Sequence, residues 1–332
     1  MKIKGFIAPI FAGALVFGLG GVAQADEVYY DMCAGNAACL AALTGGVDGW
    51  ADTDGDEGSG ANSTSELFEQ FAVHAETRTT QFDTDGNGVL SDGDKFSDFG
   101  HLNITNIVPG GGGDNEGLNS ISGFQMTAGW NGLTGTASHL VPGSTPGTLT
   151  SNIVYDTTGN ATFDFYVDDR SGGPATRTNF NYGAANAVTG ASDDTNFTDG
   201  VKVLSVQIVG GFGTNTFDAL GNFLTGSSTL NGIVTFALDD FLFFANSGLD
   251  FADLVGSAID INVFIDQNTA NVHTIPCPGN PACQPGAIFV VDSDHDGSIV
   301  FHVVPEPASV LMFGIGFMAV GCATLVARRR NA

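Results

Sequence analysis

The stretch Thr162-Phe163-Asp164-Phe165-Tyr166-Val167 places Phe, Phe and Val on one face, and Thr, Asp and Tyr on the other. A repeat of two residues is the period of a β-strand that buries one face. The segment from Ile259 to Asp266 alternates in the same way, and Val201 to Val209 is long enough to cross a sheet. Clusters of Gly, Asn, Asp, Ser and Thr separate such runs. The pattern predicts a mainly β fold, an antiparallel β-sandwich over residues 115–303.

Two hairpins are expected in this region. Strands at 152–155 and 162–167 flank the turn residues 157–160. Strands at 287–291 and 298–304 flank a segment with an Asp-Gly pair, a common turn signal, and would close the sheet.

A smaller N-terminal region, residues 26–109, precedes the sandwich, and the Gly-rich stretch 110–114 is expected to be a linker. A helix is predicted over 63–78. Ser63 fits its N-cap and Glu66 the third helical position, which together form a capping box. Apolar residues then recur at helical spacing: Leu67, Phe68, Phe71, Ala72 and Ala75.

Residues 83–94 fit a twelve-residue calcium loop of the EF-hand type. Gly88 at position 6 permits the sharp turn, and Asp replaces the usual Glu at position 12. In this the loop resembles dockerin-type calcium loops. A solvated acidic turn is the alternative. The ligands would be Asp83, Asp85, Asn87, Val89 through its carbonyl, Ser91 through water, and Asp94.

A second stretch begins in the same way with Asp292, Asp294 and Asp296. Its position 12 is Val303, so the closing ligand is missing. An ordinary turn between two strands is the favoured interpretation, and a weaker calcium site is the alternative.

The chain of 332 residues contains 36 acidic and 10 basic residues, for a formal charge of −26. Lys2, Lys4 and the cluster at 328–330 lie at the two ends, so the remainder is more acidic still. Such a surface repels nucleic acid and attracts cations, which argues against a nucleic-acid partner.

The N-terminus predicts export. Lys2 and Lys4 precede an uncharged apolar run, and Ala23 and Ala25 form a small-x-small cleavage site. Residues 1–25 therefore fit a signal peptide, with an N-terminal membrane anchor as the alternative.

The C-terminus predicts a membrane segment. The uncharged residues 308–327 would span about 30 Å as a transmembrane helix. Basic residues follow at once and favour the cytoplasmic side. They are Arg328, Arg329 and Arg330.

The order of these features, with Pro305-Glu306-Pro307 before the apolar segment, closely resembles the PEP-CTERM sorting signal of Gram-negative bacteria over residues 304–332. The resemblance implies processing by an exosortase, transit through the membrane, and a final place at the cell surface or in the extracellular matrix with exopolysaccharide. The stretch 161–265 is also similar to the flocculation-associated PEP-CTERM family, which implies a role in floc or biofilm formation. Its motifs include 163–168, 197–204 and 261–264.

Four cysteines form two pairs with the spacing C-x-G-N-x-A-C, in which Gly-Asn is a turn signal. An exported chain can form disulfides, so two small loops are expected, with cross-pairing as the alternative. The pairs are Cys33 with Cys39 and Cys277 with Cys283.

Enzyme motifs such as H-E-x-x-H, G-x-S-x-G and the P-loop do not occur in the sequence. The sequence favours a non-enzymatic matrix protein over a polysaccharide hydrolase with carboxylates from distant strands, or a passive surface-layer subunit. Exposed aromatic residues could stack on sugars, with core packing as the alternative for each. The candidates are Trp50, Trp130, Tyr155, Tyr166 and Tyr182.

Overall fold

The computed structural model describes residues 27–31, 65, 67–87, 91–108, 124–138, 140–157, 161–169, 197–198, 200–218, 223–245, 247–267, 273–276 and 286–304. Several predicted features lie outside the described residues: the signal peptide with Ala23 and Ala25, Val89, the linker 110–114, Cys33, Cys39, Cys277, Cys283, and the sorting motif with helix 308–327. Within the described residues, no helix has the length and apolar character needed to cross a membrane.

The described chain is almost entirely β-strand, with one short 3₁₀ helix, η3 (Phe251–Leu254). The strands are β1 (Val28–Tyr30), β2 (Gln70–Phe82), β3 (Asp94–Val108), β4 (Phe124–Ala137), β5 (Val141–Pro142), β6 (Thr148–Tyr155), β7 (Thr162–Asp169), β8 (Val201–Asp218), β9 (Phe223–Ala237), β10 (Leu242–Phe244), β11 (Leu249–Asp250), β12 (Ala258–Gln267), β13 (His273–Pro276) and β14 (Ala287–Val303).

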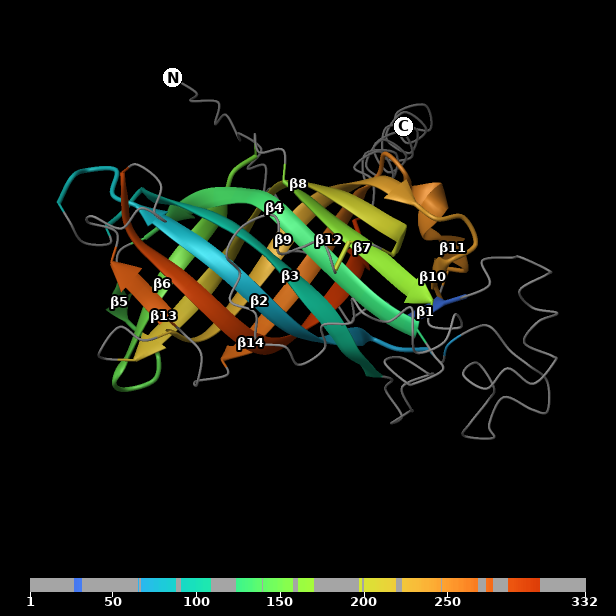
Figure 1. Cartoon of the computed structure of the whole chain (residues 1–332), viewed down its shortest axis with the longest axis horizontal. Coiled ribbons are helices and arrows are strands. Elements are labelled where there is room, and N and C mark those ends of the chain that lie inside the picture. The colour runs from blue at the N-terminus through green and yellow to red at the C-terminus, as the bar shows by residue number, and fades with distance from the viewer. Residues whose placement is uncertain are drawn as a thin grey trace, which may run out of the picture.

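The main sheet closes on itself. Its strands follow the order β3-β2-β14-β12-β9-β8-β7-β4, and β4 pairs again with β3. All these pairs are antiparallel. Figure 1 shows β9 and β12 behind β3 and β4. The prediction of a mainly β, antiparallel fold is confirmed, but continuous hydrogen bonding joins the two faces expected for the sandwich, and β2 and β3 from the predicted N-terminal region belong to the same sheet.

The predicted helix over 63–78 is wrong, because Gln70–Phe82 forms strand β2. Phe71 and Ala75 are four residues apart, a spacing that fits one face of a helix and also one face of a strand. Val73 and Thr77 complete the strand face. Pairing with β3 on one side and β14 on the other decides for the strand.

The expected closing hairpin is also wrong, because β14 runs unbroken from Ala287 to Val303. Gly297 lies within the strand, where a Cβ atom would meet the main-chain oxygen of Phe264 at 2.2 Å. This glycine therefore permits close approach of β12 rather than a turn.

Strands β6 and β7 do not form the hairpin expected between them. Both strands lie between β4 and β8. Strand β7 pairs with one segment of β8, Val201–Gln207, and strand β6 pairs with the next segment, Gly211–Asp218. Together they fill one strand position in the closed sheet.

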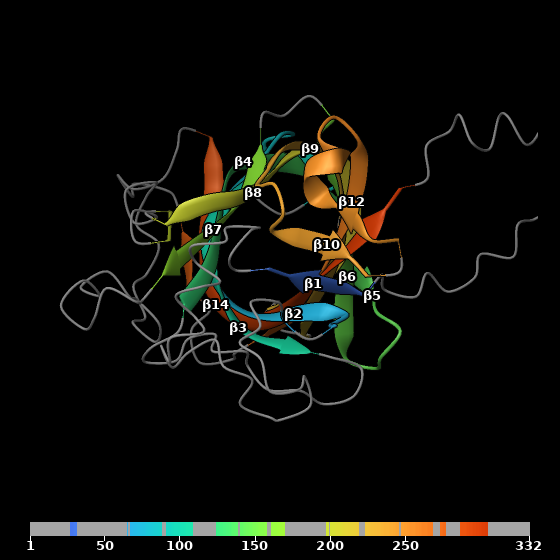
Figure 2. The same cartoon turned by 90° about the vertical axis from the view of Figure 1, so that its right-hand side faces the viewer.

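One end of the closed sheet is filled by aromatic side chains. Phe301 packs edge-on against Phe71, Phe165 and Phe251, at centroid distances of 6.1, 5.6 and 5.6 Å. A second, three-stranded sheet, β1-β10-β11, adds Tyr30 to this cluster. Figure 2 shows β1 and β10 within the outline of the surrounding strands.

Candidate functional site

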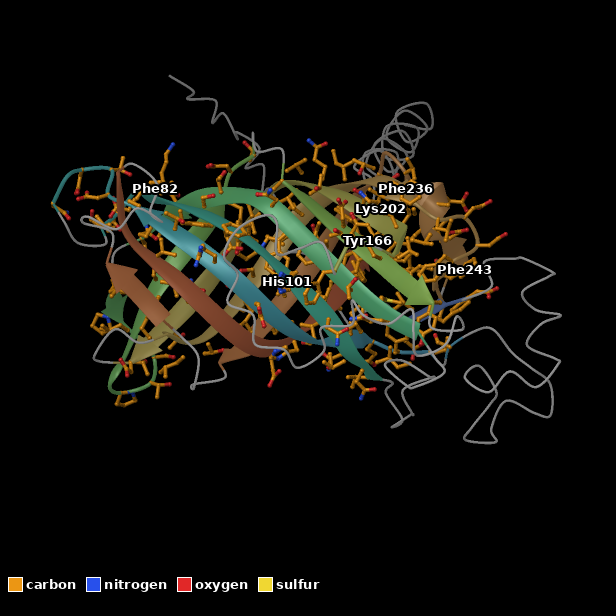
Figure 3. All side chains as sticks on the ribbon, in the orientation of Figure 1. Phe82, His101, Tyr166, Lys202, Phe236 and Phe243 are labelled. Carbon is orange, nitrogen blue, oxygen red and sulfur yellow. The ribbon has the colours of Figure 1, made fainter. Side chains whose placement is uncertain are left out.

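The predicted calcium loop connects β2 to β3 as a hairpin, and Phe82 paired with Lys95 is the last rung before it. The helix–loop–helix arrangement of an EF-hand is not observed, because strands flank the loop on both sides. In Figure 3, Phe82 marks the loop end of the molecule, and Phe243 marks the opposite end near β1.

Three of the predicted ligands come together in this loop. Asp83, Asp85 and Asp94 each offer a carboxylate oxygen, and these oxygens lie within 4.8 Å of one another. Asp94 is 0% exposed, whereas residues 84–87 are exposed. The loop therefore combines a buried carboxylate at its base with solvent-facing oxygens at its tip.

Hydrogen bonds hold these carboxylates in place. Asp94 Oδ1 accepts from the amide N–H of Thr84 at 2.8 Å, and Asp94 Oδ2 accepts from that of Ser91 at 2.8 Å. Asp83 Oδ1 accepts from the amide of Gly86 at 2.6 Å. Gly86 has φ +76°, which a non-glycine residue rarely adopts, so it permits this tight turn.

The remaining predicted ligands extend the same network. The Ser91 hydroxyl donates to Asp85 Oδ2 at 3.0 Å, and Asn87 Nδ2 donates to that oxygen at 2.8 Å. Oxygen ligands from carboxylates, amides and hydroxyls are those that Ca²⁺ prefers. The donor set fits a hard cation, and a carboxylate oxygen retains lone pairs for it while accepting a hydrogen bond.

The weaker second site is not a loop. Asp292, Asp294 and Asp296 follow one another at every second position of strand β14. Alternate residues of a strand lie about 7 Å apart along the backbone, so the loop geometry on which this prediction rested is not present in β14. The carboxylate of Asp296 contacts Nδ1 of His74 at 2.9 Å, as a hydrogen bond or, when the imidazole is protonated, as an ion pair.

A further acidic cluster has a structural explanation. Carboxylate oxygens of Asp239, Asp240 and Asp250 lie within 4.8 Å of one another. Asp250 accepts the amide N–H of Ala252 at 2.8 Å and caps η3, and its other oxygen accepts the amide of Asp240. This cluster therefore organises the turn before η3.

Sequence reasoning missed an interior cavity of about 390 Å³ on the loop side of the aromatic cluster. It is lined by residues of β2, β3, β4, β6, β7, β8, β9, β12 and β14. Most of the lining is apolar, including Val73, Leu102, Leu133, Ile153 and Leu230.

A single carboxylate, that of Asp98, is found among the described residues that line this cavity. It accepts hydrogen bonds from Thr79 Oγ1 and from Trp130 Nε1, both at 2.5 Å. Burial among protein atoms raises the pKa of Asp98 to about 6, although these two hydrogen bonds act to lower it. The side chain keeps some accessible surface because it faces the cavity rather than bulk water.

Aromatic side chains form part of the cavity wall. Trp130 stacks on Phe163 at 5.2 Å between ring centroids, and Tyr155 meets Phe96 edge-on at 5.6 Å. The Tyr155 hydroxyl shares a hydrogen bond of 2.8 Å with Ser228, and burial raises the Tyr155 pKa. Trp130 and Tyr155 are each 8% exposed, so both pack in the core and are not exposed for stacking on sugars. Trp50 and Tyr182 lie outside the described residues.

Tyr166, another predicted aromatic candidate, is partly exposed beside a cation. Lys202 Nζ lies 5.4 Å from its ring centroid and 2.9 Å from Asp164 Oδ2. Figure 3 shows Tyr166 and Lys202 together on β7 and β8. This arrangement leaves the ring partly accessible but already in contact with a charged group.

The outside of β6, β8, β9 and β12 carries two rows of side chains, which we call the outer face. One row joins residues paired across the four strands, and the second lies two residues along each strand. Phe212 is 63% exposed, Val154 55% and Phe264 50%. The other positions of the two rows carry hydroxyl or amide side chains. The first row consists of Val154, Phe212, Thr229 and Asn262. The second row consists of Asn152, Thr214, Ser227 and Phe264.

Comparison with known proteins identifies the sorting signal. Residues 303–330 match the family model of the PEP-CTERM protein-sorting motif. The predicted resemblance is confirmed: the chain carries a PEP-CTERM signal and is an exosortase substrate. No curated protein and no solved structure gives a significant match.

The class of protein follows from this motif. Proteins with a PEP-CTERM signal are exported, anchored in the membrane in transit and delivered to the cell surface, and they are typically non-enzymatic. This chain is therefore an exosortase-processed surface protein with a closed antiparallel sheet.

Proposed function

We propose that this protein is a non-enzymatic component of the extracellular matrix that contributes to floc or biofilm formation by binding exopolysaccharide in a calcium-dependent manner. The observation that carries the proposal is the sorting motif at 303–330, because it directs the chain to the surface where such matrix is assembled. The resemblance of 161–265 to the flocculation-associated family supports the same role.

The loop 83–94 supports the calcium requirement. Its three clustered carboxylates repel one another, and a divalent cation would remove that repulsion. Exposed residues at the loop tip leave part of the coordination sphere open to solvent. Calcium held there can bridge the protein to carboxylates of an acidic polysaccharide, which the negative net charge would otherwise repel.

The outer face supports the polysaccharide partner. Exposed aromatic rings such as Phe212 and Phe264 can stack against the apolar faces of sugar rings. The neighbouring hydroxyl and amide groups can hydrogen-bond sugar hydroxyls. Thr229, for example, already donates to Asn262 Oδ1 at 2.8 Å, so these groups are held in order along the strands.

Co-sedimentation tests the proposal. The processed protein recovered from cells is mixed with the exopolysaccharide of the producing strain, with calcium or with a chelator. We expect the protein to pellet with the polysaccharide in calcium and to stay in solution with chelator. Asp83→Asn and Asp85→Asn, made singly, should each weaken the calcium effect and together abolish it, whereas Asp92→Asn, which makes the same charge change as either single variant in the same loop, should not.

The remaining outcomes distinguish the alternatives. Absence of pelleting in both conditions contradicts polysaccharide binding. Shortened polysaccharide after incubation would favour a hydrolase, and self-assembly without polysaccharide affinity would favour a surface-layer subunit.

A further inference from the structure

We infer that the interior cavity binds a small organic amine with an apolar body, whose ammonium group pairs with Asp98. This site is separate from the calcium loop, and it goes beyond the proposed matrix function.

The cavity lies within the fold rather than on its surface. The closed sheet surrounds it, and the aromatic cluster around Phe301 fills the other end of the same interior. Ligand pockets commonly span 300–1,000 Å³ and are mostly apolar with a few placed polar groups. At about 390 Å³ this cavity falls within that range. By comparison with a cavity that holds benzene, it suits on the order of 15 non-hydrogen atoms.

The apolar part of the lining defines the body of the ligand. Side chains of Val73, Leu133 and Ile153 surround the interior together with the rings of Phe96 and Phe163. Rigid rings and branched aliphatic side chains favour an aromatic or compact branched body over a long flexible chain, because such a body fills the volume with few rotamers to lose.

Asp98 defines the charge of the ligand. Its two described hydrogen-bond donors, Thr79 and Trp130, are both neutral. No Lys, Arg or His occurs among the described residues that line the cavity. A buried carboxylate without a cationic partner is costly, and a ligand ammonium would supply that partner. Carboxylate oxygens accept more than one hydrogen bond each, so the existing donors leave room for it.

The neighbouring polar groups are consistent with a cation. Tyr155 and Ser228 share one hydrogen bond, so the tyrosine hydroxyl can turn an oxygen lone pair toward a donor. Thr77, Gln81, Ser151 and Asn215 add oxygen atoms around the cavity. Asp98 and Tyr155 are the titratable groups among the described lining residues, and neither carries a positive charge.

The test compares three probes of equal shape and different charge by isothermal titration and thermal shift: 2-phenylethylamine, 2-phenylethanol and phenylacetate. The processed protein is used at pH 8. We expect the amine to bind at least tenfold more tightly than the alcohol, and the anion not to bind. Equal binding of the amine and the alcohol, or no binding by any of a series of amines from butylamine to naphthylethylamine at 1 mM, overturns the inference.

Two variants locate the site. Asp98→Asn keeps the shape of the side chain and removes its charge, so amine affinity should fall at least tenfold while alcohol affinity changes less than threefold. Asp253→Asn removes an exposed carboxylate at the opposite end and should change neither. Unchanged amine binding in Asp98→Asn contradicts the assignment.

The pH dependence of wild-type binding requires no variant. Protonation of Asp98 removes the charge that the ammonium needs, so amine affinity should fall roughly tenfold between pH 8 and pH 5. Constant amine affinity across this range contradicts a role for Asp98.

Discussion

The indole Nε1 of Trp130 donates a hydrogen bond to Oδ1 of Asp98 across 2.5 Å inside the closed sheet. Trp130 belongs to β4 and Asp98 to β3, and this is the strand pair that closes the sheet. Thr79 of β2 holds the other oxygen. One buried carboxylate therefore links three adjacent strands and faces the cavity at the same time.

The stability of the protein should depend on the ionisation of Asp98. Its pKa is about 6 in the folded state and near 3.8 in the unfolded chain, so the folded state holds the proton more tightly. The stabilising effect of protonation is fully present below pH 4 and is lost as the pH rises to about 6. A shift of this size corresponds to about 3 kcal/mol of unfolding free energy.

Asp98→Asn isolates this effect, because other acids titrate in the same range. The free energy of unfolding of the variant relative to wild type should rise by about 2–3 kcal/mol between pH 4 and pH 8. Urea denaturation at both pH values measures the difference. A constant difference would show that Asp98 titrates normally.

Gly297 should be essential to the pairing of β12 with β14. A Cβ atom at this position would meet the main-chain oxygen of Phe264 at 2.2 Å, and a backbone atom cannot move aside cheaply. We expect Gly297→Ala to destabilise the protein by about 2 kcal/mol or more. Thermal unfolding measures the loss. Gly129→Ala is the matched control, because its nearest contact is a side-chain methyl at 3.4 Å; similar losses in both variants would refute the explanation.

Asp94 should contribute to stability as well as to calcium affinity. It is fully buried and accepts amide hydrogen bonds from Thr84 and Ser91. Asp94→Ala leaves both donors without this partner and should cost about 2 kcal/mol in the absence of calcium. Asp85→Asn, at the exposed tip, should weaken calcium binding with a much smaller effect on unfolding. Calorimetry with and without calcium separates the two, and equal effects of both variants on unfolding would contradict the division of roles.

The outer face should contribute to binding without contributing to stability. Phe212→Ala and Phe264→Ala remove exposed rings, so unfolding midpoints should change little. Binding to exopolysaccharide in the sedimentation assay should weaken at least threefold in each. Val255→Ala, which truncates an equally exposed apolar residue elsewhere, serves as the control. Loss of binding in the control alone would point to a different surface.

The alternating pattern predicted the β fold because period-two runs such as 162–167 and 259–266 become β7 and β12. Prediction from local sequence failed where the same residue pattern is compatible with two kinds of secondary structure. Phe71 and Ala75 fit both a helix and a strand, and Asp-Gly at 296–297 serves strand packing in place of a turn. Partner strands far away in the sequence decided both cases.

The calcium loop could be proposed from sequence because its ligands lie within twelve consecutive residues, and three of them do converge. The cavity could not, because its lining comes from nine strands. Asp98 is the one local signal, because it lies between Phe96 and Leu102, which also line the cavity. An inward-facing carboxylate can be inferred from this pattern only after β3 is known to be a strand.

We propose that calcium at the loop 83–94 retains this exosortase-processed protein in the matrix. The most direct measurement is the fraction of processed protein in the matrix and in the medium of growing cultures, before and after calcium is chelated. We expect wild-type protein to move from matrix to medium on chelation, and the Asp83→Asn, Asp85→Asn variant to be in the medium throughout. Retention of wild type after chelation, or the same distribution for wild type and variant, would contradict the claim.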